Sequence, residues 1–89
     1  MLERDLIVTN KLGLHARATA KLVQAVAPFR SHVTLSAKGR QVNAKSIMGV
    51  MLLAAGQGTA VTVRTDGDDE TACMDAIEAL FERRFDEEG

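Results

Sequence analysis

His15 and Arg17 stand two residues apart, where a strand-like segment gives way to helical spacing. This places His15 at or next to the N-cap of a helix, a position usually taken by Ser, Thr, Asp or Asn. The free amides of a first helical turn carry partial positive charge and bind anions. A neutral imidazole is a nucleophile, and a guanidinium matches phosphate oxygens. The stretch therefore predicts a phosphoryl group carried on His15, with a solvated surface histidine as the alternative.

The apolar pattern predicts elements in the order β-α-β-β-α-β-α around this stretch. Strands are expected over 6–8, 32–36, 40–43 and 59–65. Helices are expected over 16–27, from 46 to the glycines near 56–58, and from about 70 onward, before a tail at 86–89 that frays. This pattern indicates an α+β fold with three helices on one face of a four-stranded antiparallel sheet. An open-faced two-layer sandwich and a ferredoxin-like arrangement both satisfy it.

The same pattern assigns residues to the core and to the surface. The first helix is expected to have one apolar stripe of Ala16, Ala20, Val23 and Ala27, flanked by Leu22 and Val26. The last helix is expected to bury Cys73, Ile77, Leu80, Phe81 and Phe85. If Val50 and Leu53 of the second helix face the core, the residues left at least partly exposed are Ile47, Met48, Met51 and Leu52.

The composition is that of a small globular chain. With 89 residues, 46% of them hydrophobic, one domain spanning 1–89 is expected. The net charge of −1 and the scarcity of aromatic residues argue against a nucleic-acid-binding protein. Cys73 is the single cysteine, so no intramolecular disulfide can form. No apolar run approaches the ~20 residues that span a bilayer, and a cytoplasmic protein is expected.

Two further groups of chemically capable residues are assigned no site. His32 has no acidic or cysteine partner at metal-ligand spacing and is expected to be solvated. The run from Asp68 to Glu70 lacks the spacing of a metal-binding loop, and its charges suit the start of the helix that follows. Neither a metal nor a cofactor is predicted.

Two stretches resemble the motifs of one family and stand at the expected separation. The first is Asn10-Lys11-Leu12-Gly13-Leu14-His15-Ala16-Arg17. It resembles the active centre of HPr, the histidine-containing phosphocarrier family of the bacterial phosphoenolpyruvate phosphotransferase system. The second resembles that family's regulatory-serine segment and reads Asn43-Ala44-Lys45-Ser46-Ile47-Met48-Gly49-Val50-Met51. The resemblance covers nearly the whole chain and implies an open-faced sandwich with sheet order 1-4-2-3.

The resemblance implies a phosphoryl carrier that forms a phosphohistidine and is not an enzyme on its own. His15 would accept a phosphoryl group on Nδ1 from phosphorylated enzyme I and pass it to a histidine of an enzyme IIA. Arg17 and the backbone amides of Ala16, Arg17 and Ala18 are expected to hold the phosphate. A monomer is expected, with neither nucleic-acid binding nor membrane insertion.

Ala18 stands where many members of the family have proline, and its amide adds a hydrogen-bond donor. This motif and the acidic tail look closer to the nitrogen-type branch, NPr, than to sugar-type HPr. The nitrogen-type branch passes phosphate to a regulatory enzyme IIA. A sugar-type protein that supports carbohydrate uptake is the alternative.

Ser46 is a favourable N-cap for the second helix, and the resemblance makes it a candidate for phosphorylation by an HPr kinase/phosphorylase. The resemblance also implies a docking surface over the first two helices. The residues expected there are Thr19, Lys21, Gln24, Lys45, Ile47, Met48 and Met51. Two other interpretations stay open. One is a regulatory binding module acting through Ser46 and the second helix, and the other is an α/β nucleic-acid module.

Overall fold

The structure is a computed structural model that describes residues 1–87. The strands are β1 (Leu2–Ile7), β2 (His32–Ala37), β3 (Arg40–Asn43) and β4 (Ala60–Asp66). The helices are α1 (Ala16–Val26), α2 (Ile47–Leu53), α3 (Glu70–Glu82) and a short 3-10 helix, η1 (Arg84–Asp86). The predicted order of elements is confirmed, with η1 added after the last helix.

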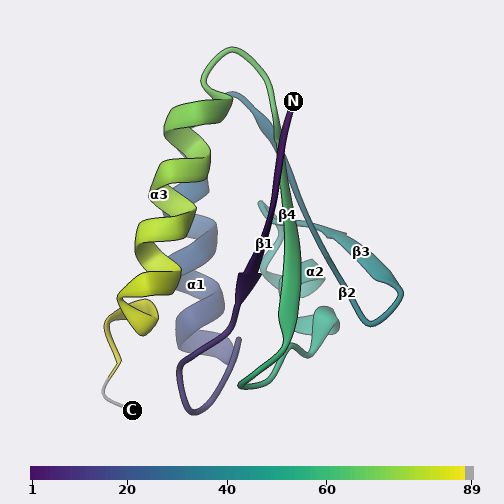
Figure 1. The fold of residues 1–89 in the computed structure, drawn as a ribbon, viewed down its shortest axis with the longest axis vertical. Coiled ribbons are helices and arrows are strands. Elements are labelled where there is room, and N and C mark those ends of the chain that lie inside the picture. Colours follow the sequence, from purple (N-terminus) through teal and green to yellow (C-terminus); the bar gives the residue numbers. More distant parts are fainter. Residues whose placement is uncertain (88–89) are drawn as a thin grey trace.

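The strands form one antiparallel sheet in the order β1-β4-β2-β3. Figure 1 shows α1 and α3 side by side on one face of this sheet, and α2 packs over its β2–β3 end. The face that carries His32 and Arg64 is not covered by a helix. The predicted open-faced sandwich is therefore confirmed. Among residues 1–87, no helix has the length and apolar character needed to cross a membrane.

Aliphatic side chains fill the space between the helices and the sheet. Val33 and Leu35 of β2 and Val61 and Val63 of β4 are fully or almost fully buried, as their alternation with polar residues predicts. The predicted buried stripe of α3 is also confirmed, together with Phe85 in η1. Burial raises the pKa of the Cys73 thiol in this stripe. These two layers give the chain a single continuous core.

The buried face of α1 differs from the predicted one. The residues that α1 buries are Ala18, Thr19, Leu22 and Val26, while Ala16 and Ala27 are exposed. The prediction was wrong because alanine is small enough to lie on either face of a helix. The spacing of the larger residues, Leu22 and Val26, marks the buried face, and α1 contacts α2, α3 and η1.

The edge strand β1 begins at residue 2, whereas the sequence predicted a start at residue 6. The charged residues at its start belong to the strand because β1 pairs only with β4, which leaves its charges in solvent. Glu3 pairs with Arg64 of β4, and Arg4 pairs with Glu78 of α3. The charged residues therefore belong to the edge strand, and the short apolar run predicted only the last two residues of β1.

The end of α2 also differs from the prediction. The helix ends at Leu53, and Ala54 takes the left-handed conformation, with φ +52°, that the glycines at 56 and 58 were expected to supply. The chain turns early because Ala55 packs into the core. Its carbonyl oxygen accepts the amide of Leu14 at 2.9 Å, which fixes the end of α2 against the loop before α1.

The C-terminal tail is more ordered than predicted. Phe85 is fully buried within η1, in contact with Phe81 at a ring-centroid distance of 4.9 Å. This anchor holds Asp86 and Glu87 against the body of the protein, so the prediction that the tail frays was wrong for these two residues. The rest of that predicted tail, 88–89, lies outside the described residues.

Basic side chains from distant segments bind carbonyl oxygens at the ends of the helices, where backbone acceptors lack partners. The contacts are Lys45 Nζ to Phe29 O at 2.6 Å, Arg40 Nη1 to Leu52 O at 3.0 Å, Lys38 Nζ to Ala54 O at 3.1 Å and Lys21 Nζ to Phe85 O at 2.9 Å. Each contact ties the end of one element to another part of the chain.

Candidate functional site

His15 is the N-cap residue of α1, as predicted. Its backbone is extended, with φ −75° and ψ −177°, and its carbonyl oxygen accepts the amide of Thr19 at 2.8 Å. Its ring nitrogen Nδ1 accepts the amide of Arg17 at 3.3 Å. The imidazole therefore takes the place of the short side-chain oxygen that usually caps a helix, and Nδ1 lies at the positive end of α1.

Gly13 shapes the loop that presents His15. Its φ is +68°, and a Cβ at this position would lie 2.6 Å from the carbonyl oxygen of Ala55 and 2.7 Å from the Cα of Gly56. Because these are backbone atoms, no side chain fits there. The close approach brings Leu14 within hydrogen-bond distance of Ala55, so the segment after α2 holds the loop before His15 in place.

The tail supplies a carboxylate to the site. Glu87 pairs with Nε2 of His15, the ring nitrogen that does not face α1. Asn10 Nδ2 donates to Glu87 Oε1 at 2.9 Å and to the carbonyl oxygen of Gly13 at 2.7 Å. Burial by itself would raise the pKa of Glu87. Hydrogen bonds from Asn10 and His15 and the charges of His15 and Arg17 outweigh burial, so the pKa of this carboxyl lies below its usual value.

Sequence reasoning missed Glu87 and gave Asn10 no role in the site. Glu87 is 72 residues from His15 along the chain, and no local pattern relates the two. The only signal was the acidic composition of the tail, which is equally typical of a solvated end.

An open groove surrounds the exposed edge of His15. Its lining residues are Lys11, Leu12, His15, Ala16, Arg17, Lys21, Asp86 and Glu87. The groove combines three basic side chains with the first-turn amides of α1, so an anion that enters it meets positive charge from several directions. Arg17 lies in that first turn, and His15 lies just outside it. This arrangement matters because two residues that are two positions apart within a helix do not face each other. A nucleophilic nitrogen, a guanidinium and the first-turn residues Ala16 and Arg17 thus share one space, whereas Ala18, whose amide was also predicted to hold the phosphate, is fully buried.

The apolar surface predicted on α2 is exposed. Ile47, Met48 and Met51 expose 48%, 73% and 44% of their surface, while Val50 and Leu53 face the core. Ser46 caps the helix as predicted, with its Oγ accepting the amide of Gly49 at 3.1 Å. Apolar side chains of this size rarely lie together in solvent without a partner.

The polar residues predicted around that surface divide into two groups. Gln24 and Lys45 are exposed, and Lys21 is partly exposed in the groove beside His15. Thr19 is fully buried, and its hydroxyl donates to the carbonyl oxygen of Leu14 at 3.0 Å. The prediction that Thr19 lies on the docking surface was wrong, because its side chain supports the loop from inside. Leu12, which is 70% exposed in the groove, is an apolar residue that the sequence did not single out.

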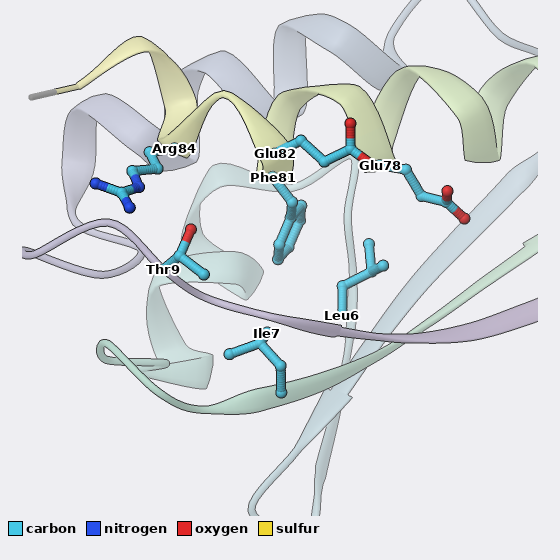
Figure 2. Close-up of a pocket in the computed structure, with 7 residues that line it drawn as sticks. All are labelled: Leu6, Ile7, Thr9, Glu78, Phe81, Glu82 and Arg84. Atoms are coloured by element: carbon cyan, nitrogen blue, oxygen red, sulfur yellow. The ribbon is translucent and has the colours of Figure 1, made fainter. Parts of the chain in front are cut away.

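A second groove lies between β1 and α3 (Figure 2). Leu6 and Phe81 point into the space between the strand and the helix, and Ile7 points away from it. Its lining residues include neither histidine nor cysteine, and the carboxylate of Glu78 at its rim pairs with Arg4. The groove is therefore unsuited to the chemistry that His15 can perform.

The acidic run before α3 serves the fold. Asp69 accepts hydrogen bonds from the amides of Arg30 and Ser31 at 2.9 and 3.0 Å and from the Ser31 hydroxyl. The Ser31 hydroxyl is the largest cause of a lowered pKa of Asp69, followed by the Arg30 amide. His32, as predicted, is exposed.

Comparison with known families adds an independent observation to this geometry. The family described as "PTS HPr component phosphorylation site" matches the chain over residues 2–83. The chain belongs to the HPr family. Members of this family are phosphocarrier components of the phosphotransferase system, and the resemblance predicted from the two motifs is confirmed.

Relatives named HPr and a relative named NPr match the chain over nearly its full length. It is 69% identical over 88 residues to "Phosphocarrier protein HPr" of Xylella fastidiosa, covering 99% of both chains. It is 40% identical to "Phosphocarrier protein NPr" of Shewanella violacea, covering 97% of this chain and 94% of the relative.

Solved structures of HPr proteins share the fold. A crystal structure of HPr from Thermoanaerobacter tengcongensis superposes with a TM-score of 0.96 at 42% identity and covers 100% of both chains. An HPr dimer from the same organism superposes with a TM-score of 0.79 at 41% identity, covering 98% of this chain and 100% of the other.

Proposed function

We propose that His15 accepts a phosphoryl group from phosphorylated enzyme I and donates it to a histidine of an enzyme IIA. The observation that carries this proposal is the position of Nδ1 at the N-terminus of α1, 3.3 Å from the Arg17 amide. Membership of the HPr family supports it. The protein acts as a carrier, because each transfer uses a histidine of the partner as donor or acceptor.

Each transfer exchanges one phosphorus–nitrogen bond for another. The lone pair of His15 Nδ1 attacks the phosphorus, the Nδ1–P bond forms, and the bond from phosphorus to the donor histidine breaks. The departing histidine keeps the bonding electron pair. The amide of Arg17 is released from Nδ1 in this step and joins the Arg17 guanidinium and the amide of Ala16 in stabilising the negative charge on the phosphoryl oxygens. The reverse sequence of bonds delivers the group to enzyme IIA.

The exposed apolar residues of α2, with Lys21, Gln24 and Lys45, form the proposed docking surface for both partners. Its apolar members are those that expose large side chains, and methionine adapts to more than one partner. Phosphorylation of Ser46 by an HPr kinase/phosphorylase is part of the proposal. It would add negative charge beside this surface and oppose docking of an acidic partner. The protein would work as a monomer in the cytoplasm.

We place the chain in the nitrogen-type relay, with the sugar-type relay as the alternative. The support for this choice is the motif Gly13-Leu14-His15-Ala16-Arg17-Ala18 and the acidic tail. The 69% identical relative is named HPr and the relative named NPr is 40% identical, so the choice depends on which partners exchange phosphate with this chain.

The experiment is a phosphotransfer assay with enzyme I of each type. The protein is incubated with phosphoenolpyruvate, Mg²⁺ and one enzyme I, beside a His15→Ala control. We expect an acid-labile adduct on the parent, absent from the control and formed faster with the nitrogen-type enzyme I. Absence of an adduct with both enzymes would overturn the carrier function. Faster reaction with the sugar-type enzyme would reassign the branch alone.

A further inference from the structure

The carboxylate of Glu87 links the tail to the ring nitrogen of His15 that the transfer does not use. We propose that Asn10 and Glu87 are positioning residues, which hold the neutral imidazole in the tautomer with its proton on Nε2. This inference deepens the proposed function and depends on it for its role in transfer. The tautomer itself is a property of the unphosphorylated protein and can be measured separately.

The hydrogen bonds of His15 define the tautomer. Nδ1 accepts the amide of Arg17, so it must carry a lone pair. In a neutral ring the proton then lies on Nε2, and Nε2 donates it to the carboxylate of Glu87. The two contacts support each other, because a proton on Nδ1 would break both hydrogen bonds. The nitrogen left with its lone pair is the one at the helix N-terminus.

Asn10 holds the carboxylate of Glu87 in position. Asn10 is fully buried, and its Nδ2 bridges Glu87 Oε1 and the carbonyl oxygen of Gly13. Among the described residues its Oδ1 is buried without a hydrogen-bond partner, an arrangement that lowers the stability of the fold. A residue selected for stability alone would not leave this oxygen unpaired. The lowered pKa of Glu87 keeps its carboxyl ionised, and therefore an acceptor, at neutral pH.

The arrangement also suits the charge that develops on the ring. When Nδ1 attacks phosphorus with the proton still on Nε2, the product is a phosphoimidazolium with a positive ring. No proton has to leave, and the Nε2–H stays against the carboxylate, which stabilises the cation. The other charged residues that line the groove are Lys11, Arg17, Lys21 and Asp86. Glu87 contacts Nε2 and not Nδ1, so Nδ1 has only to release the amide of Arg17 before it attacks the phosphorus.

The test measures the tautomer by ¹⁵N NMR of the His15 ring in the unphosphorylated full-length protein, at a pH where the ring is neutral. We expect the parent to show the proton on Nε2. Glu87→Gln is expected to give a mixture of both tautomers, because an amide can donate to Nε2 as well as accept from it. Glu82→Gln makes the same chemical change at an exposed residue of α3 and is expected to match the parent.

The same variants are then compared in phosphoryl transfer from enzyme I. Glu87→Gln is expected to slow the initial rate about tenfold, the lower end of the roughly 10–100-fold losses typical when a group that orients a metal-bound histidine is removed. Asn10→Ala is expected to shift the tautomer in the same direction. A parent ring protonated on Nδ1, or a Glu87→Gln ring that keeps the parent tautomer, would overturn the inference. If the NMR result is as expected but no enzyme I transfers phosphate, the proposed function fails and the positioning of the ring stands.

Discussion

The helices α1 and α2 begin in the same way but with different capping atoms. His15 and Ser46 both have extended backbones, and each accepts one amide of its helix, at 3.3 and 3.1 Å. The hydroxyl of Ser46 makes the contact expected of a cap. The imidazole of His15 makes a longer contact and has a second nitrogen, which reaches Glu87. The poorer cap is therefore the one with an atom available for chemistry.

The comparison shows how a helix N-terminus can serve stability or function. A serine oxygen satisfies an amide that would otherwise lack a partner. A histidine in the same place gives up part of that stabilisation and puts a nucleophile where an anion is favoured. The surroundings agree with this division, since basic residues line the groove at His15 and apolar side chains flank Ser46.

The sharpest test of this comparison is His15→Asn. Asparagine caps helices well, so the variant is expected to gain about 0.5–1 kcal/mol in free energy of unfolding. It has no nucleophilic nitrogen, so we expect it to lose phosphoryl acceptance completely. Urea denaturation and the enzyme I assay measure the two effects. A variant less stable than the parent would show that histidine, with its cap and its contact to Glu87 together, stabilises this helix start more than an asparagine cap does, and would break the comparison.

Gly13→Ala tests whether the backbone of the loop before α1 must be held in place for His15 to be positioned at the helix start. The positive φ alone costs about 1–3 kcal/mol for a non-glycine residue, and the Cβ would also meet the backbone at Ala55. We expect a larger loss of stability than from Gly39→Ala, together with weaker phosphoryl acceptance. Gly39 has a φ of +77° and nothing within 4 Å of its Cβ position, so it isolates the backbone effect. Equal losses from both variants would contradict the packing argument.

Ser46→Ala tests the second helix start of the comparison, where the cap of α2 serves stability. Removal of a serine N-cap costs about 1 kcal/mol in free energy of unfolding. Because the hydroxyl is not part of the His15 groove, phosphoryl acceptance from enzyme I is expected to remain at the parent level. Thermal denaturation and the transfer assay provide the two readings. Loss of acceptance in a folded Ser46→Ala protein would show that the two helix starts are functionally linked.

The smallest expected effect concerns the start of α3, where Asp69 binds the segment before β2 instead of capping its own helix. The pKa of Asp69 is lowered in the folded protein, mainly by the Ser31 hydroxyl. Its stabilisation is therefore present above the unfolded value of about 3.9 and is lost as the pH falls through the lower folded value. We expect Asp69→Asn to reduce the Tm at pH 7, with the gap to the parent closing in acid. A gap that is constant with pH would contradict this assignment.

Much of this architecture follows from the sequence because local patterns encode it. Alternation fixed the inward faces of β2 and β4, and serine at 46 marked the start of α2. The buried face of α1 was mispredicted because alanine spacing does not choose a face. The ordered tail was missed because Phe85 anchors it through contacts distant in the chain.

The residues of the site also divide into those that local sequence patterns predict and those that only the folded chain brings together. His15 and Arg17 were predictable because a helix start relates residues that are close in sequence. Glu87 and Asn10 were not, because their relation to the ring exists only once the tail folds back on the loop. Thr19 was assigned to the docking surface because the family resemblance implied such a surface over the first two helices, whereas here its hydroxyl binds the buried carbonyl of Leu14.

The basic side chains at the helix ends have a consequence for acid unfolding. Their acceptors are backbone carbonyl oxygens such as those of Phe29 and Leu52, which do not titrate, so these contacts survive protonation of the carboxylates. The polar side-chain contacts of β1 are different. They depend on the carboxylates of Glu3, Asp5 and Glu78, and the N-terminal amine just before the strand pairs with Glu70. Acid therefore weakens these side-chain contacts while the fastenings of the helix ends remain, and a β1 that comes away would leave β4 with an unpaired edge.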